Sequence, residues 1–131
     1  MNESNGNLIK NSICKYDSIW KKYWRTPQER NMPNKIISIH LKKGMREYKK
    51  LNGKLLMEEQ QSTSSDFVQF YKLFAKAVTC RIIAMGLLFE EYKERCFGKN
   101  YLRFSNMIKS SNYLQEKALY YAYHGGYIEK E

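Results

Sequence analysis

Apolar residues recur at spacings of three and four from Phe67 to Phe97, which is the period of an α-helix. One face collects large side chains, namely Phe67, Phe70, Tyr71, Phe74, Val78, Ile82, Met85, Leu88, Phe89, Tyr92 and Cys96. The other face carries polar and charged residues, among them Lys72 and Lys76. A membrane-spanning helix needs about 20 predominantly apolar residues without an ordered charged stripe. The pattern therefore predicts a long central helix over about 66–97 that faces water, and no transmembrane span.

A second amphipathic segment covers about residues 33–52. Its apolar arc, about 120° wide at 100° per residue, contains Ile37, Leu41, Gly44, Met45, Tyr48 and Leu51. The opposite arc is basic and holds Lys35, Lys42, Lys43, Arg46, Lys49 and Lys50. We predict a basic amphipathic helix here that ends at Asn52-Gly53, because glycine commonly follows the last helical residue. Residues 54–61 are then either a short helix or an extension of this one past the glycine. Gly44 on the apolar arc indicates a place where another backbone approaches closely.

The first 32 residues indicate an extended, basic and aromatic arm that carries one short helix. Within residues 13–24, Tyr16, Ile19 and Trp20 are spaced by three and four. Thr26 is followed by a proline and, three residues on, by Glu29, which is the pattern of a capping box at a helix start. Pro33 follows soon afterwards, so residues 25–34 are predicted to be a connector.

The C-terminal part is predicted to contain shorter helices. Gly98 provides a stop for the central helix, and helical patterns follow at residues 101–109 and 112–123. Only 2 prolines and 7 glycines occur in 131 residues, which favours long helices over a turn-rich sheet. The expected fold is all-α: a small helical bundle that forms a single domain over residues 33–131, with core helices in 66–123, preceded by the arm of residues 1–32.

The positive charge is unevenly distributed. The formal net charge is +10, and residues 1–54 hold 13 of the 23 lysines and arginines but only 4 of the 13 acidic residues. Charge is nearly balanced in the rest of the chain. This asymmetry is typical of a segment that binds a polyanion, joined to a body made for packing.

The stretch WKKYWR alternates rings with cations, a combination in which bases stack while Lys and Arg neutralise phosphates. In an alternative that the sequence leaves open, Trp20 and Trp24 are core or interface anchors. The predicted nucleic-acid-binding residues are Trp20, Lys21, Lys22, Trp24, Arg25, Lys35, Lys42, Lys43, Arg46, Lys49 and Lys50. A basic amphipathic helix also suits an anionic membrane or an acidic protein partner, but the apolar arc of this one contains no Trp or Phe.

Arg81 is unusual because it projects from the apolar face of the central helix, with no acidic residue three or four positions away. Either it reaches past its neighbours to water or to a distant carboxylate, or this face is shared with another subunit or RNA. The second interpretation predicts an interface that includes Phe70, Phe74, Arg81 and Leu88.

The sequence contains few residues that are candidates for catalysis or metal binding. His40 and His124 have no neighbouring nucleophile in the sequence, and no glycine-rich phosphate loop occurs. Three cysteines show no metal-ligand spacing, which indicates a reducing, intracellular setting. We therefore expect no enzyme activity, no metal and no cofactor. The expected compartment is the cytoplasm, with the nucleus and the mitochondrion as alternatives, and the N-terminus does not have the pattern of a secretory signal.

These observations predict a non-catalytic basic accessory protein that docks on a ribonucleoprotein, with a ribosome-associated protein or factor as the best fit. Its partners would be nucleic acid, RNA in preference to DNA, and other proteins of the same assembly. The main alternative is a structural subunit of a multi-protein complex, including a mitochondrial membrane complex, in which aromatic helices form protein-protein interfaces. An inhibitor or effector of an enzyme is a third class that no residue pattern supports or dismisses.

Overall fold

The long apolar stripe forms helix α4 (Ser65–Glu94), the 30-residue centre of the fold. The structure is a computed structural model, which describes the backbone of residues 2–126 and the side chains of residues 6–126. Most large residues of the predicted stripe are buried along α4, including Phe67, Phe70, Phe74 and Met85. Ile82, Phe89 and Tyr92 are partly buried, and Cys96 is exposed beyond the end of α4. At about 1.5–3 kcal/mol for each large apolar side chain removed from water, this face supplies much of the free energy of folding.

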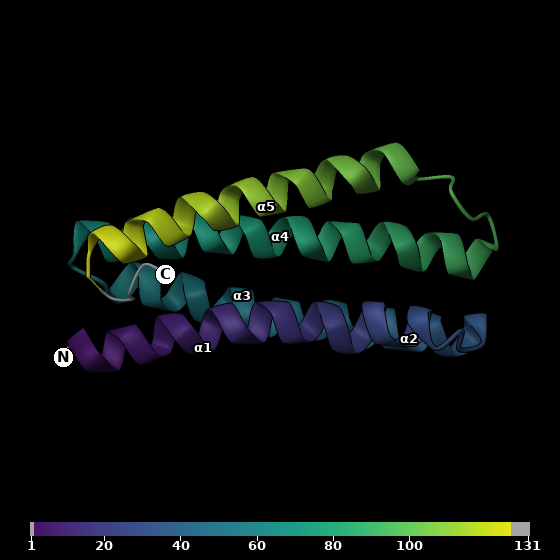
Figure 1. Cartoon of the computed structure of the whole chain (residues 1–131), viewed down its shortest axis with the longest axis horizontal. Coiled ribbons are helices and arrows are strands. Elements are labelled where there is room, and N and C mark those ends of the chain that lie inside the picture. Colours follow the sequence, from purple (N-terminus) through teal and green to yellow (C-terminus); the bar gives the residue numbers. More distant parts are fainter. Residues whose placement is uncertain (1, 127–131) are drawn as a thin grey trace.

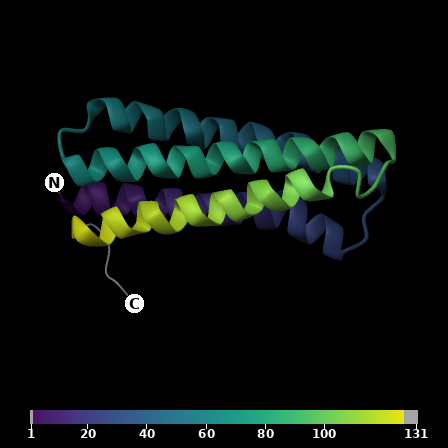
Figure 2. The same cartoon turned by 90° about the horizontal axis from the view of Figure 1, so that it is seen from above.

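Four helical rods lie side by side and alternate in direction (Figures 1 and 2). The first rod is α1 (Asn2–Trp20), continued by the π-helical turn η1 (Lys21–Arg25) and by α2 (Thr26–Glu29). The others are α3 (Asn34–Gln61), α4 and α5 (Tyr101–His124). The part of the chain that the structure describes contains no strand. The prediction of a small all-α bundle is confirmed. In Figure 1, α1 and α3 form one layer, and α4 and α5 form the other.

None of the helices within residues 2–126 combines the length and the apolarity that crossing a membrane requires. Lys72 and Lys76 of α4 are both exposed, as the helical projection predicted.

The core joins the N-terminal helix to the centre of the bundle through aromatic residues. The ring centroid of Tyr16 in α1 lies 5.1 Å from that of Phe74 in α4 and 5.9 Å from that of Tyr48 in α3. The Tyr48 hydroxyl donates a buried 2.8 Å hydrogen bond to the Tyr16 carbonyl oxygen. Residues 1–32 had been predicted to form an extended arm, but the described part is helical from Asn2, and Ile9 and Tyr16 are core residues.

The predicted capping box at Thr26 does not form. Arg25 and Thr26 have helical dihedral angles and make no side-chain cap, so the helix runs on from η1 into α2. A proline within a helix clashes with the carbonyl four residues earlier, and the wider π turn before Pro27 accommodates it. The helical rod ends instead at Asn31, whose φ is 50°, followed by Pro33.

Helix α3 does not stop at Gly53 but continues to Gln61. Leu51 and Leu55, on either side of the glycine, are both buried, and the Asn52 side chain donates a 3.1 Å hydrogen bond to Thr79 Oγ1 of α4. A glycine within a helix costs about 1 kcal/mol, which is less than the burial of one leucine provides. Packing against α4 therefore carries the helix past the predicted stop.

The C-terminal helices also differ from the prediction, because residues 101–109 and 112–123 belong to one helix, α5. Ser111, near the predicted break, is buried, and its hydroxyl donates a 2.8 Å hydrogen bond to the Ile108 carbonyl oxygen. A serine that is satisfied in this way is tolerated within a helix. Helix α4 ends slightly earlier than predicted, at Glu94, and left-handed Arg95 and Gly98 reverse the chain.

Glu91 holds this reversal in place. Its carboxylate is only 6% exposed and accepts hydrogen bonds from the backbone N–H of Gly98 (2.8 Å) and Asn100 (2.9 Å). Substitution Glu91→Ala leaves both donors without this acceptor, so we expect a loss of about 2–4 kcal/mol in the free energy of unfolding. Urea denaturation measures it. Glu94→Ala is the matched control and is expected to change stability little, since that carboxylate pairs with Lys99 at the surface. Equal losses for both variants would contradict this role of Glu91.

Candidate functional site

The cations of the N-terminal part lie on two adjacent helical rods. All are exposed, and they are Lys10, Lys15, Lys21, Lys22, Arg25, Arg30, Lys35, Lys42, Lys43, Arg46, Lys49, Lys50 and Lys54. The first six belong to α1, η1 and the end of α2, and the rest belong to α3. Because these rods form one layer of the bundle (Figure 1), the charge asymmetry of the sequence becomes an asymmetry between the two layers. We call this layer's surface the α1–α3 face.

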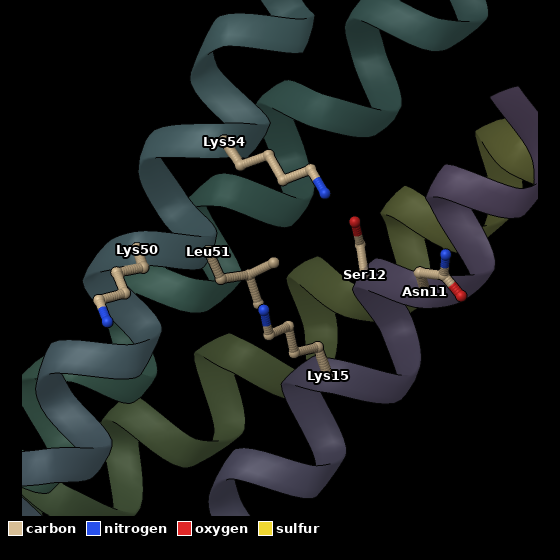
Figure 3. Close-up of a pocket in the computed structure, with 6 residues that line it drawn as sticks. All are labelled: Asn11, Ser12, Lys15, Lys50, Leu51 and Lys54. Atoms are coloured by element: carbon tan, nitrogen blue, oxygen red, sulfur yellow. The ribbon is translucent and has the colours of Figure 1, made fainter.

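A groove of about 380 Å³ runs between the two helices of this face. Its lining residues are Asn11, Ser12 and Lys15 from α1, and Lys50, Leu51 and Lys54 from α3. In Figure 3 the side chains of Lys15 and Lys54 extend into the gap between the helices, and the Ser12 hydroxyl points toward the Lys54 ammonium. Lys50 projects away from the gap.

The local sequence explains this geometry. Ser12 and Leu51 are buried and form the floor, because they fall on the inward faces of their helices. The lysines come from flanking positions, where the aliphatic stem packs along apolar surface and the ammonium stays in water. Farther along the same pair of rods the backbones approach closely, since a Cβ placed on Gly44 would lie 2.8 Å from the Tyr23 Cβ. The predicted close approach at Gly44 is confirmed.

The positive charge of the face is mostly uncompensated. Within residues 6–54 the acidic residues are Asp17, Glu29 and Glu47. Among side chains that the structure describes, Glu47 alone forms an ion pair with one of these cations, at 3.6 Å from Lys50. That pair is solvent-exposed and therefore weak. A surface with this excess of cations attracts polyanions and raises their association rate.

The tryptophans of WKKYWR pack within the bundle. The Trp20 ring stacks on Phe104 of α5, with centroids 6.2 Å apart and an interplanar angle of 19°. The Trp24 ring meets Tyr92 of α4 edge-on at 5.9 Å. These contacts support the alternative in which both rings are core anchors. Of the predicted binding residues, the lysines and arginines are exposed and the two tryptophans are partly buried, although Trp20 lines a cavity together with Lys21 and Arg25.

The residues of the predicted interface on α4 lie inside the bundle. Phe70, Phe74 and Leu88 are buried, and Arg81 is 8% exposed. Arg81 forms no ion pair with a described carboxylate. Its Nε donates to Ser111 Oγ at 2.8 Å, and its Nη2 donates to Asn112 Oδ1 at 2.9 Å.

The guanidinium of Arg81 also lies against two rings, 5.0 Å from the centroid of Tyr16 and 4.6 Å from that of Trp20. Such cation–π contacts partly replace the water that a buried cation loses. Burial raises the pKa of the Tyr16 phenol, and the positive charge of Arg81 opposes this shift. Arg81 thus joins three helices of the bundle around one buried charge.

The described residues contain no cluster of three His, Cys, Asp or Glu that could hold a metal ion. Cys14, Cys80 and Cys96 are all free thiols. His40 lies beside the Tyr23 ring, and His124 Nδ1 lies 3.8 Å from an Asp66 oxygen.

Five lining residues of the groove were not among those predicted, namely Asn11, Ser12, Lys15, Leu51 and Lys54. Lys15 and Lys54 stand 39 positions apart in the sequence. Only the register between α1 and α3 brings them together, and no local pattern encodes that register. The excess of cations in residues 1–54 was the available signal. Comparisons of the chain with protein-family models, with curated proteins and with solved structures found no significant match.

Proposed function

We propose that this protein is a non-catalytic accessory protein that docks on the RNA of a ribonucleoprotein, such as a ribosome, through its α1–α3 face. The observation that carries the proposal is the gathering of 13 exposed cations on two neighbouring rods, with Lys15 and Lys54 extending into the groove between them. The opposite layer has no comparable excess, because its lysines and arginines are interspersed with acidic residues.

Docking would act through phosphates and not through bases. A lysine ammonium is a compact charge with rotatable donors, well suited to phosphate oxygens and indifferent to base identity. Because the Trp20 ring stacks on Phe104 and the Trp24 ring packs edge-on against Tyr92, base stacking is not part of the proposal. The expected binding is therefore tolerant of sequence, and it depends on the shape of a phosphate backbone that follows the groove.

The α4–α5 layer offers a surface for protein partners of the same assembly. Two tyrosines of α5, Tyr113 and Tyr120, are 57% and 58% exposed, and Tyr101 and Leu102 project at its N-terminal end. Exposed tyrosines are enriched in protein-protein interfaces. In this arrangement one layer contacts RNA and the other contacts protein.

Salt dependence tests the docking. The logarithm of the affinity for a structured RNA should fall linearly with the logarithm of salt concentration between about 50 and 300 mM, since each neutralised phosphate releases counterions. The double variant Lys15→Gln, Lys54→Gln should weaken binding and reduce the magnitude of the slope by about 1.4–1.8, at about 0.7–0.9 for each phosphate contact. Fluorescence anisotropy at several salt concentrations measures both quantities.

The control is Lys72→Gln, Lys76→Gln, which removes the same charge from α4 and should leave the slope unchanged. Nuclease treatment of native assemblies distinguishes the alternative, a structural subunit held by protein contacts. RNA docking requires that nuclease releases the protein. Continued retention after complete RNA digestion, or a slope that the groove variant leaves unaltered, would contradict it.

A further inference from the structure

Arg81 carries a buried charge without a buried counter-charge. Among residues 6–126, no carboxylate oxygen lies within 4.0 Å of its guanidinium. Its hydrogen-bond acceptors, Ser111 and Asn112, are neutral. Taking a charge out of water is costly unless an opposite charge accompanies it. A guanidinium also has more N–H donors than these two bonds use. The phenols of Tyr16 and Tyr48 also lie near the guanidinium, but they are neutral too, so only an anion would supply the opposite charge.

Arg81 opens into a cavity that could hold such an anion. The cavity has a volume of about 410 Å³ and is lined by Asp17, Ser18, Trp20, Lys21, Arg25 and Arg81. It lies on a different flank of α1 from the groove, because its lining side chains beyond α1 and η1 come from α4 and not from α3. Three cations and one carboxylate face it, so the cavity carries net positive charge.

The backbone at this cavity is unusual. Lys21 and Arg25 are the first and last residues of the π-helical turn η1. A π turn inside an α-helix is rare and is found frequently at functional sites. Here the wider turn places both cations on the wall of the same cavity, together with Ser18 from the preceding turn. The cavity, the buried charge and the π turn are separate observations at one place.

We propose that this cavity binds a single phosphate group. The planar guanidinium of Arg81 supplies paired donors that match phosphate oxygens, and Lys21 and Arg25 neutralise the charge from the open side. The Ser18 hydroxyl is a further donor. Asp17 opposes the bound anion, so the site would be weak enough for exchange. Lys21 and Arg25 also belong to the α1–α3 face, but the cavity shares no lining residue with the groove, so phosphate binding can be tested separately from RNA docking.

Inorganic phosphate is the first probe. Titration into the full-length protein at constant ionic strength, followed by the indole N–H signal of Trp20 in NMR spectra, should show saturable binding. The variant Lys21→Gln, Arg25→Gln should weaken it at least 10-fold without unfolding, because both side chains are exposed. Asp17→Asn should strengthen it several-fold by removing the like charge. The control Lys50→Gln, Lys54→Gln should change it less than 2-fold.

A second pair of probes identifies the source of the phosphate. One comparison is between a 5′-phosphorylated oligonucleotide and its 5′-hydroxyl counterpart. If the phosphorylated one binds more tightly, and the variant Lys21→Gln, Arg25→Gln abolishes the difference, the ligand is the end of a nucleic acid. Equal binding of the two oligonucleotides, together with saturable binding of inorganic phosphate, supports a small phosphorylated molecule. The proposal is overturned if the NMR signal of Trp20 never saturates with phosphate. It is also overturned if the Lys50→Gln, Lys54→Gln control loses as much phosphate affinity as the Lys21→Gln, Arg25→Gln variant.

Discussion

Gly44→Leu is expected to unfold the protein. A Cβ at this position would lie 2.7 Å from the Met85 sulfur and 2.8 Å from the Tyr23 Cβ. The methionine end can rotate away, but the Tyr23 Cβ moves only with its backbone. Overpacking by single methylenes costs about 1–3 kcal/mol, and leucine adds several carbons to a fold whose total stability is on the order of 5–15 kcal/mol. Circular dichroism of the purified variant, with thermal melting, measures the loss.

A graded comparison within α3 isolates the cause. Gly53 is exposed, and a Cβ there would meet nothing within 4 Å. Gly53→Ala should therefore stabilise the protein by about 0.5–1 kcal/mol through higher helix propensity. Gly44→Ala gains the same propensity but must push Tyr23 aside, so its melting temperature should fall. The same Gly→Ala substitution is thus expected to raise the stability at one position of α3 and to lower it at another. A rise in melting temperature for both variants would show that η1 and α3 are not in close contact at Gly44.

Reversing four charges on α3 is expected to reduce the affinity for RNA on the order of 100-fold or more at about 100 mM salt, because each reversal removes one phosphate contact and adds repulsion. The substitutions are Lys42→Glu, Lys43→Glu, Arg46→Glu and Lys49→Glu. All four side chains are exposed, so the helical content and the thermal stability should stay close to those of the parent protein. Fluorescence anisotropy and circular dichroism measure the two properties.

The control for this variant changes the net charge equally on the other layer. Lys72→Glu, Lys76→Glu, Lys109→Glu and Lys117→Glu alter exposed residues of α4 and α5. They should weaken RNA binding less than about 5-fold, through long-range repulsion that salt screens. Equal losses of RNA affinity for the two variants would mean that net charge governs binding. The α1–α3 face would then not be the docking surface.

The contacts of Trp20 and Arg81 show why functional residues are harder to predict than helices. Both project from helical faces whose periodicity was predicted correctly. Their roles depend on what lies across the bundle, which is Phe104 for Trp20, and Ser111 and Asn112 for Arg81. Those partners stand more than 25 positions away in the sequence. A helical projection shows which way a side chain points from its own helix, but not which side chain it meets.

The helix boundaries likewise depend on residues that are distant in the sequence. The stop predicted at Gly53 and the break predicted between residues 109 and 112 both rested on local preferences, which are worth about 1 kcal/mol or less. The contacts of Leu55 and Ser111 with neighbouring helices outweighed them. The extended arm was predicted because residues 1–12 are polar, yet Ile9 and Ser12 of that segment are buried against the bundle.

The amino-acid sequence was enough to predict an all-α bundle, the long α4 stripe, the cationic side of α3 and the concentration of charge in residues 1–54. These properties depend on residue type and spacing along one helix. Tertiary packing decided where the helices end, which rods lie side by side, and therefore which charges share the groove and which surround Arg81. The physical reason is that burial of one large side chain, at about 1.5–3 kcal/mol, exceeds most local preferences, and burial depends on residues distant in the sequence.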